Sequence, residues 1–249
     1  MADALLEVAN LHAHYGESHI LHGVDFTVNK GEVVTLLGRN GAGRTTTLRA
    51  ILGLTGSRSG SIKINGVETI ALATHKIAHL GLGYCPEERG IFASLSCEEN
   101  LLLPPVLGKP VGKPVGKPAG ANGATGMTVA EIYEMFPNLS ERRNSQGTRL
   151  SGGEQQMLAV ARILRTGASL LLLDEISEGL APVIVQALAR MIRMLKAKGY
   201  TIVMVEQNFR FAAPLADRFY VMEHGKIVQG FASGELEGTM NMLHEYLGV

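Results

Sequence analysis

The stretch Gly38-Arg39-Asn40-Gly41-Ala42-Gly43-Arg44-Thr45-Thr46 decides the fold, because the segments on either side are arranged around it. Before it, the short apolar run from Val33 to Leu37 is typical of a buried strand. After it, residues 46–52 have a helical pattern, and Gly53 stands where a C-terminal cap is expected. A glycine turn between a strand and a helix directs successive backbone N–H groups at one point, where the helix adds its positive end. The sequence therefore predicts an anion-binding site at this turn.

The spacing of this stretch is that of the phosphate-binding P-loop, G-x-x-x-x-G-K-[ST], with an arginine at the lysine position. Arg44 keeps the positive charge but replaces a compact ammonium with a wide, forked guanidinium. We therefore expect the loop to bind a nucleoside triphosphate. The expected binding residues are Gly38, Arg39, Asn40, Gly41, Ala42, Gly43, Arg44, Thr45 and Thr46. An ordinary glycine turn between a strand and a helix is the structural alternative.

Composition and charge narrow the possible classes of protein. The chain has 249 residues, enough for one large α/β domain or two small ones. Its 23 Lys and Arg residues balance its 23 Asp and Glu residues, which argues against broad electrostatic binding to nucleic acid or anionic lipid. The two cysteines, Cys85 and Cys97, indicate reduced thiols in a cytosolic protein. The 8 histidines, scattered singly along the sequence, show no spacing typical of a metal site.

The sequence shows neither a signal-peptide pattern nor an apolar run long enough to cross a bilayer. The first seven residues lack a basic region followed by an apolar core. Residues 170–173 and 202–205 are apolar, but each run has the length of a strand. If the protein works at a membrane, we expect another chain to provide the membrane-spanning segments.

Hydrophobic patterns along the chain predict strands that alternate with helices. Patterns typical of strands occur at residues 5–8, 20–21, 24–28, 61–64, 170–173, 201–205 and 219–222. Asn65-Gly66 adds a hairpin signal. Patterns typical of helices occur at residues 129–136, 151–165, 182–198 and 242–247. Strands alternating with helices after a phosphate loop favour a largely parallel sheet that is covered on both faces.

Residues 104–127 differ in character from the rest of the chain. The tripeptide Gly-Lys-Pro recurs from Gly108, Gly112 and Gly116, and the segment continues to Gly126 without apolar periodicity. Such a composition cannot build a packed core, so we expect a flexible loop. Its lysines could contact a partner or lipid headgroups, although a solvated spacer is the more common role of such segments.

The string Leu150-Ser151-Gly152-Gly153-Glu154-Gln155-Gln156 is the most specific motif in the chain. Ser151 and Glu154 have the spacing of a capping box, which predicts a helix that starts at Ser151. This structural interpretation leaves the two adjacent glycines unexplained, because glycine costs about 1 kcal/mol in a helix. Bare glycines at a helix start suit the close approach of an anion to the backbone.

The string resembles the signature sequence of ABC-type ATPases, and the phosphate loop lies upstream of it, as in that family. The resemblance covers nearly the whole chain and implies an α/β fold. It implies one ABC nucleotide-binding domain over residues 1–249, with a β-rich N-terminal part, a RecA-like P-loop NTPase core and a helical subdomain at about residues 88–165. In that family two domains pair head to tail. The signature of one, here Ser151, Gly152 and Gly153, closes over the ATP held by the phosphate loop of the other.

Asp174 and Glu175 follow an apolar run that resembles the Walker B strand of the family. A buried strand that delivers two carboxylates to the edge of an α/β sheet places them where ligands bind. By resemblance, Asp174 holds Mg²⁺ together with the hydroxyl of Thr45. Glu175 would orient and polarise the attacking water. Carboxylates that cap the next helix are the structural alternative.

Three further positions are assigned by the same resemblance. Tyr15 stands where the family places an aromatic ring against adenine, although a tyrosine after a strand is as often partly core. Glu87 replaces a glutamine that contacts Mg²⁺ and water, and Gln207 replaces a histidine that senses the γ-phosphate. Together with Arg44, three altered groups surround one γ-phosphate. The resemblance therefore implies ATP binding more directly than it implies turnover.

The departures from the general ABC pattern at Glu87 and Gln207 narrow the resemblance to one branch of the family. This branch is the LivF-type ATPase subunit of bacterial branched-chain amino-acid importers. The segments that carry it are Pro86-Glu87, residues 92–103, residues 178–182 and residues 205–208. The resemblance implies a cytoplasmic subunit that hydrolyses Mg-ATP and pairs with a like or a sister ATPase. It further implies docking of the helical subdomain on multispan permease subunits at the inner face of the cell membrane, which serve a periplasmic binding protein. The transported molecule is set by those other chains.

Two alternatives remain open at this point. The three altered groups are compatible with a regulatory subunit that binds ATP but hydrolyses little of it. A soluble ABC ATPase that acts on nucleic acid or in cofactor assembly is the other alternative. The balanced charge and the absence of long coiled-coil heptads weigh against the DNA-repair types.

Overall fold

The computed structural model describes residues 3–105 and 126–247, and the chain divides into two compact units. Unit 1 comprises Met1–Leu80 and Thr201–Val249, and unit 2 comprises Gly81–Tyr200. The flexible loop predicted at residues 104–127 falls mostly on residues 106–125, which lie outside the described residues. Within the described ranges, no helix combines the length and the hydrophobicity that a membrane span requires.

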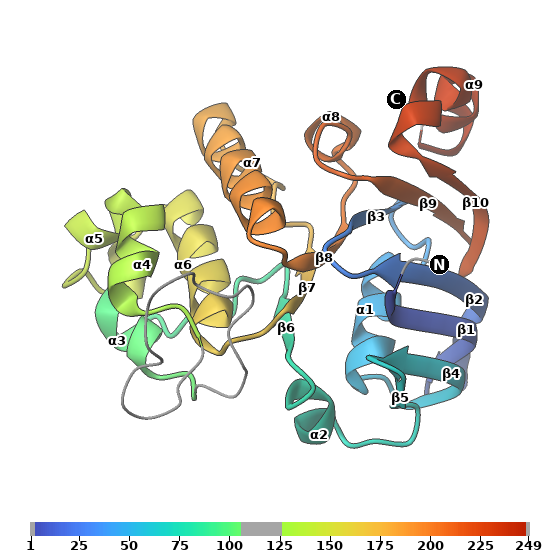
Figure 1. Ribbon diagram of the computed structural model, residues 1–249, viewed down its shortest axis with the longest axis horizontal. Helices are drawn as coiled ribbons and strands as arrows, with labels where there is room; N and C mark the ends of the chain where they lie inside the picture. The colour runs from blue at the N-terminus through green and yellow to red at the C-terminus, as the bar shows by residue number, and fades with distance from the viewer. Residues whose placement is uncertain (1–2, 106–125, 248–249) are drawn as a thin grey trace. The chain divides into compact units, whose positions relative to one another are not determined.

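Unit 1 contains an antiparallel sheet with the strand order β2-β1-β4-β5 (Figure 1). Its strands are β1 (Ala4–Tyr15), β2 (Ser18–Asn29), β4 (Ser57–Ile64) and β5 (Val67–Glu68). β2 replaces the two short strands predicted at residues 20–21 and 24–28. Leu11 pairs with Val24 while His12 pairs with His22, so Gly23 is the extra residue of a β-bulge. Its positive φ of 83° lets the strand continue through the bulge.

The hairpin predicted at Asn65-Gly66 is confirmed. It joins β4 to β5, which pair in antiparallel fashion from Ile64 opposite Val67. Asn65 has φ 50° and Gly66 has φ 75°, the combination that a two-residue hairpin turn of type I′ requires.

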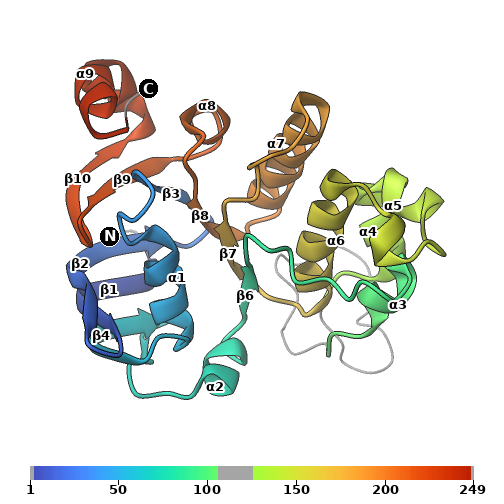
Figure 2. The same cartoon turned by 180° about the vertical axis from the view of Figure 1, so that it is seen from behind.

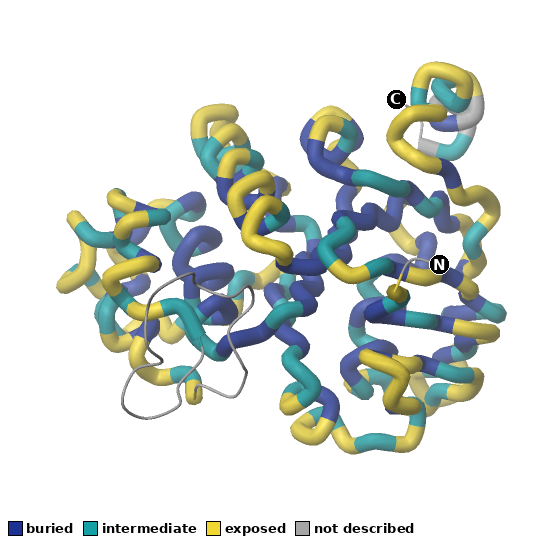
Figure 3. The backbone as a smooth tube through the Cα atoms, viewed as in Figure 1, coloured by how far each residue is buried: buried dark blue, intermediate teal, exposed yellow. Residues whose placement is uncertain are grey.

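A second sheet in unit 1 carries the phosphate loop. β3 (Val33–Leu37) is fully buried and lies parallel to both β8 (Thr201–Val205) and β9 (Arg218–Glu223), whereas β10 (Lys226–Ala232) is antiparallel to β9. In Figure 3, β3 has the colour of buried residues. The helices of unit 1 are α1 (Arg44–Leu52), α2 (Thr74–Ala78), α8 (Phe209–Ala212) and α9 (Leu236–Leu247). The predicted parallel arrangement is confirmed.

Unit 2 combines a parallel strand pair with a group of helices. β6 (Leu82–Cys85) pairs with β7 (Leu170–Asp174), so that Cys85 lies opposite Leu173. The helices α3 (Cys97–Leu102), α4 (Val129–Met135), α5 (Pro137–Glu141) and α6 (Gly152–Arg165) gather together (Figure 2), and α7 (Pro182–Ala197) follows β7. Helices α3 to α6 fall inside the range predicted for a helical subdomain. The division of the chain into domains stays a prediction.

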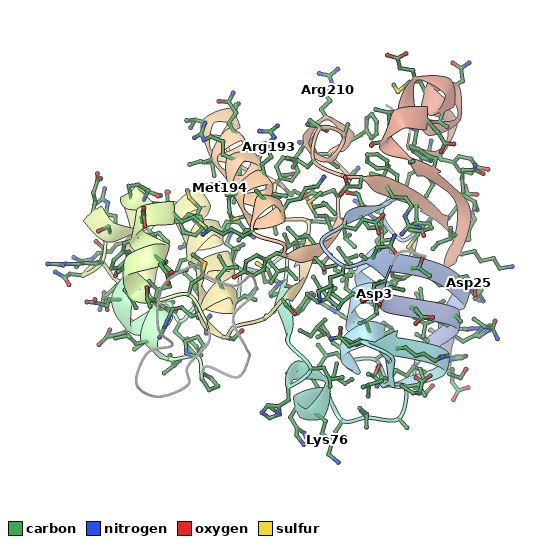
Figure 4. All side chains as sticks on the ribbon, in the orientation of Figure 1. Asp3, Asp25, Lys76, Arg193, Met194 and Arg210 are labelled. Carbon is green, nitrogen blue, oxygen red and sulfur yellow. The ribbon has the colours of Figure 1, made fainter. Side chains whose placement is uncertain are left out.

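Helix α7 lies within the range predicted for a helix at residues 182–198, and it has one apolar face. Leu188, Met191, Ile192 and Leu195 on that face are buried. Val183, in the first turn of α7, is 65% exposed because the core-facing contacts begin one turn later. Arg193 and Met194 lie on the outer side of the same helix (Figure 4).

Candidate nucleotide-binding site

The phosphate loop lies between the end of β3 and the start of α1, as the sequence predicts. Gly41 has φ 83° and Gly43 has φ 102°. Residues other than glycine adopt this region of backbone conformation only under strain. Arg39, Asn40 and Gly41 are exposed, whereas Gly38, Ala42 and Gly43 are buried. The loop therefore presents its tip to solvent and rests its two ends on unit 1.

Backbone hydrogen bonds hold the loop in shape. The N–H of Ala42 donates to the carbonyl of Arg39 at 3.0 Å, and the N–H of Gly225 donates to the carbonyl of Ala42 at 2.9 Å. The N–H of His22 donates in turn to the carbonyl of Gly225 at 2.9 Å. The turn between β9 and β10 thus ties the loop to β2, which pre-organises its backbone N–H groups.

The first turn of α1 is built to receive an anion. Its N-cap is Gly43, which has no side chain to accept a hydrogen bond from the first N–H groups of the helix. Both the N–H and the hydroxyl of Thr47 donate to the carbonyl of Gly43, each at 2.9 Å. These bonds fix the turn while the preceding N–H groups point toward the loop, the geometry of a phosphate site.

Arg44 lies folded across the loop. Its side chain is only 4% exposed, and Nη2 donates to Oδ1 of Asn40 at 3.2 Å. Thr45 and Thr46, which follow it, are half-buried. The positive charge predicted for this position is therefore present at the loop, in contact with a residue of the loop itself.

Gln207 and Tyr15 also belong to unit 1. Leu36 of β3 pairs in parallel with Val205 of β8, so Gly38 and Gln207 both follow the carboxyl ends of neighbouring strands. Gln207 is exposed at that edge, where open α/β sheets bind ligands. Tyr15 is the last residue of β1 and is 38% exposed, so part of its surface is open to solvent, and its stacking on adenine stays a prediction.

Asp174 is the last residue of β7 in unit 2, and Glu175 follows it. Asp174 is 1% exposed, and its Oδ2 accepts a hydrogen bond from the hydroxyl of Tyr84 at 2.9 Å. Tyr84 lies on the neighbouring strand β6, a placement that no sequence motif indicated. Glu175 has φ 48°, a left-handed backbone conformation that is uncommon for a residue with a side chain.

The structure brings Glu87 and Glu175 together, with Glu178 beside them. One carboxylate oxygen from each of the three lies within 4.8 Å of the others. Glu175 is half-buried, whereas Glu87 and Glu178 are exposed. Like charges at this spacing repel one another, so a cation among them would be stabilised. Thr45 belongs to unit 1 and Asp174 to unit 2, so the Mg²⁺ site that they are predicted to share stays a prediction.

Helix α6 starts with the predicted capping box. Oγ of Ser151 accepts from the N–H of Glu154 at 3.3 Å, and Oε2 of Glu154 accepts from the N–H of Ser151 at 2.7 Å. The second glycine of the string has a structural reason that sequence reasoning missed. A Cβ on Gly153 would lie 2.6–2.9 Å from three side-chain carbons of Ile184 in α7, so only glycine fits at this helix crossing.

Two arginines that were not predicted connect the segment after β6 to helix α6. Nη1 of Arg89 donates to Oε1 of Gln155 at 2.8 Å. Arg162 donates to the carbonyl of Gly90, and its guanidinium lies 4.7 Å above the ring of Phe92. The segment that holds Glu87 is therefore anchored to the helix that carries Gly152 and Gly153.

The two cysteines are free, buried thiols, as the sequence indicates. Burial raises the pKa of the Cys85 thiol to about 12, with a further contribution from the negative charge of Asp174. Burial also raises the pKa of the Cys97 thiol to about 11. Both thiols stay protonated near neutral pH and are poor nucleophiles.

A phosphate loop at the carboxyl end of a parallel strand, and a buried strand that ends in two carboxylates, define the chain as a P-loop NTPase. The family model of the ABC transporter matches residues 21–178, more than half of the chain. The chain belongs to the ABC transporter family, and it is an ATP-binding, ATP-hydrolysing cassette of that family.

Similar proteins agree with this assignment over all or nearly all of their length. The chain is 38% identical over 244 residues to the high-affinity branched-chain amino acid transport ATP-binding protein BraG of Pseudomonas aeruginosa, covering 98% of this chain and 100% of BraG. It is 34% identical over 238 residues to the lipopolysaccharide export system ATP-binding protein LptB of Haemophilus influenzae, covering 96% and 93%.

A solved structure supports the fold. The crystal structure of a nucleotide-free ATP-binding cassette from an ABC transporter matches with a TM-score of 0.78 at 23% sequence identity, covering 96% of this chain and 95% of that chain. The fold class and the family predicted from the sequence are confirmed.

Proposed function

We propose that this chain powers the uptake of branched-chain or related amino acids through separate permease subunits. The observation that carries the proposal is the 38% identity with BraG, which extends over 98% of this chain and all of BraG. The resemblance of the residues around Glu87, Gln207 and Pro182 to importer ATPases supports the same direction of transport.

The phosphates of ATP would bind to the backbone of residues 38–46, and the adenine to the ring of Tyr15. The hydroxyl of Thr45 and the carboxylates of Asp174 and Glu87 are hard oxygen donors, the ligand type that suits Mg²⁺. When bound, Mg²⁺ would neutralise negative charge that develops on the phosphates. Tyr84, which donates to Asp174 at 2.9 Å, would hold that carboxylate in one orientation.

Glu175 is the residue that we assign to the attacking water, and Gln207 is assigned to contact the γ-phosphate. The left-handed backbone of Glu175, at φ 48°, would help to direct its carboxylate just after the end of β7. The charge of Arg44 would stabilise the negative charge of the phosphates.

The remaining partners are proposed from the family. Two chains, identical or related, would pair so that Ser151, Gly152 and Gly153 of one close over the ATP held by the other. The pair would work at the cytoplasmic face of the cell membrane, bound to multispan permease subunits and serving a periplasmic binding protein. The anchoring of the Glu87 segment to α6 by Arg89 and Arg162 would link the nucleotide to the helices expected to contact a permease.

Replacing Glu175 tests the catalytic assignment. We expect Glu175→Gln to lower the rate of phosphate release by about 10²–10⁴-fold, the usual effect of a general base, while Mg-dependent ATP affinity is retained. Glu178→Gln removes a neighbouring charge of the same cluster and serves as the matched control, with most activity kept. A folded wild-type protein without Mg-dependent ATP affinity would refute the enzyme assignment.

A regulatory subunit with little hydrolysis is the second candidate, which the three altered groups Arg44, Glu87 and Gln207 favour. Arg44→Lys separates the two functions, because lysine restores the usual P-loop residue. For an ATPase we expect phosphate release to stay equal or to rise. Equal and negligible rates in the wild type and in Glu175→Gln, with and without permease subunits, would support the regulatory function.

Similarity to LptB, an export protein, makes export a further candidate for the direction of transport. Neighbouring genes for multispan permeases and a periplasmic binding protein would support uptake. The direction of transport can then be measured in energised membrane vesicles that contain the chain with those permeases. Labelled leucine is the transported probe.

A further inference from the structure

Four of the histidines gather on the hairpin formed by β1 and β2, although they are scattered singly in the sequence. His12 lies opposite His22 and His14 lies opposite His19, so the pairing of the strands brings all four to one region. The histidines show no spacing typical of a metal site along the sequence, and the pairing of β1 with β2 brings these four together. The spacing along the chain hides the cluster because two bulges, at Gly23 and beside Leu21, change the register between the pairs.

The cluster, which we name the histidine hairpin (His12, His14, His19 and His22), faces away from the core. Leu11, Ala13 and Leu21 on the same strands are completely buried. His12, His14 and His22 are half-buried, and His19 is exposed. Such partial exposure lets an ion from solvent reach the imidazole nitrogens.

His19 is the centre of the cluster because it contacts the three other rings. Its Nε2 lies 3.1 Å from Nδ1 of His12. Its ring stacks on that of His14 at 4.1 Å between centroids, with an angle of 9° between the planes, and lies 4.0 Å from that of His22. Any ion held by His19 would therefore have the other imidazoles beside it.

The hydrogen bonds of His12 decide which nitrogen can bind a ligand. Nε2 of His12 lies 3.1 Å from Oδ1 of Asn10, an oxygen that can only accept, so Nε2 carries the proton. The lone pair on Nδ1 then faces Nε2 of His19. An imidazole that donates from one nitrogen to a carbonyl oxygen, and offers the other, is the usual state of a metal-bound histidine. Asn10 is itself fixed, since its N–H donates to Oδ1 of Asp25 at 2.8 Å (Asp25 is labelled in Figure 4).

We propose that the histidine hairpin binds a divalent transition-metal ion of the Zn²⁺ type, with Nδ1 of His12 and Nε2 of His19 as the first two ligands. Two nitrogens bound to a tetrahedral Zn²⁺ lie about 3.4 Å apart, given bonds of about 2.0–2.1 Å, and the observed separation is 3.1 Å. As the ion binds, the proton that His19 holds on Nε2 would move to Nδ1 of the same ring, so both imidazoles stay neutral and no proton is released.

His14 or His22 would supply the third ligand after a rotation of its side chain. Such a rotation is needed because, among the residues that the structure describes, only the three glutamates of unit 2 place three ligand atoms within 4.8 Å of one another. Water would complete the coordination, as in open zinc sites. Imidazole ligands select Zn²⁺, Cu²⁺ or Ni²⁺ over Mg²⁺, which prefers oxygen.

A neighbouring residue with a fixed positive charge, Lys226, acts on His22. Lys226 opposes the approach of a cation, so the site relies on the imidazole bonds rather than on charge attraction.

Titration of Zn²⁺ into the whole, untagged protein tests the proposal. The protein is first stripped with EDTA and kept in excess MgCl₂, which occupies oxygen sites, and ZnCl₂ binding is followed by calorimetry. We expect one Zn²⁺ per chain. Co²⁺ should give the visible absorption of a tetrahedral nitrogen site. Less than one ion per chain in the wild type would overturn the proposal.

Variants assign the ion to the hairpin. His12→Gln and His19→Gln should each weaken Zn²⁺ binding by about 100-fold, and Asn10→Gly by about tenfold, the range for a ligand's hydrogen-bond partner. Glycine is chosen at Asn10 because the φ of this residue is 47°. If His12→Gln fails to fold, His19→Gln still tests the site. Because His19 is exposed, its replacement should leave the fold intact.

The matched control is the double variant His75→Gln and His79→Gln. Both side chains are exposed in and next to α2, four residues apart, where a helical pair of histidines could hold an ion by itself. Unchanged Zn²⁺ affinity in this variant supports the hairpin. Loss of binding here, with full binding in His19→Gln, would overturn the proposal.

Discussion

The phosphate loop and the signature string both place glycines at the start of a helix, but for different physical reasons. Gly41 and Gly43 in the loop have φ 83° and 102°, so the backbone itself requires glycine. Gly153 lies inside α6 with ordinary helical geometry, and glycine is required because Ile184 occupies the space of a Cβ. Glycine therefore meets a conformational requirement in unit 1 and a packing requirement in unit 2.

The two helix starts also differ in their caps. Helix α6 has a complete capping box from Ser151 and Glu154, so its first turn is stable without a ligand. Helix α1 has glycine as its N-cap and gains no such hydrogen bond. An anion therefore stabilises the start of α1 more than the start of α6.

The largest expected effect comes from Gly43→Ala. The new methyl group would combine a strained φ of 102° with a contact of 2.9 Å to Cδ2 of Leu21, and we expect the free energy of unfolding to fall by about 3 kcal/mol. ATP affinity should fall with it. Adding Leu21→Ala should not restore either property, because the backbone strain remains. Urea denaturation and nucleotide binding measure both, and a full rescue would mean that packing alone requires this glycine.

Gly153→Ala should have a smaller effect that a second change can relieve. Overpacking against Ile184 is expected to lower the free energy of unfolding by about 2 kcal/mol. Combining it with Ile184→Ala should recover at least about 1 kcal/mol relative to the sum of the single changes. A double-mutant cycle by urea denaturation measures this coupling. Additive effects would contradict the packing explanation.

Gly152→Ala should have the smallest effect on stability. The three atoms nearest to its Cβ would belong to the guanidinium of Arg89, at 3.2–3.5 Å, and that group can move. Because alanine also favours the helix by up to about 1 kcal/mol, we expect thermal stability to stay equal or to rise slightly. If the signature closes over ATP, hydrolysis should fall by about tenfold or more, since a methyl group would then separate backbone and phosphate. Unchanged hydrolysis would indicate that this glycine does not face a nucleotide.

Features set by nearby residues could be predicted from the sequence. The strand, loop and helix around Gly41, the capping box at Ser151 and the hairpin at Asn65 each depend on a few neighbouring positions, and the structure contains all three. The continuous strand β2 could not be predicted, because the bulge at Gly23 depends on pairing with β1.

The candidate site was predictable in its residue types but not in its contacts. Asp174 and Glu175 follow a recognisable apolar run, yet the hydrogen bond from Tyr84 depends on the pairing of β6 with β7. Glu87 and Glu175 lie far apart in the sequence and meet only in the folded unit. The contact of Gly153 with Ile184 likewise depends on the crossing of two helices, which no local pattern encodes.

The inert thiols of Cys85 and Cys97 make the chain suited to site-specific labelling. Since both are buried and hold their protons near neutral pH, a maleimide reagent would react first with a cysteine introduced on the surface. Lys76 in unit 1 and Arg193 in unit 2 are exposed positions for such cysteines (Figure 4). A spin-label pair at these positions would report the distance between the two units through a cycle of nucleotide binding and release, with no native cysteine to remove first.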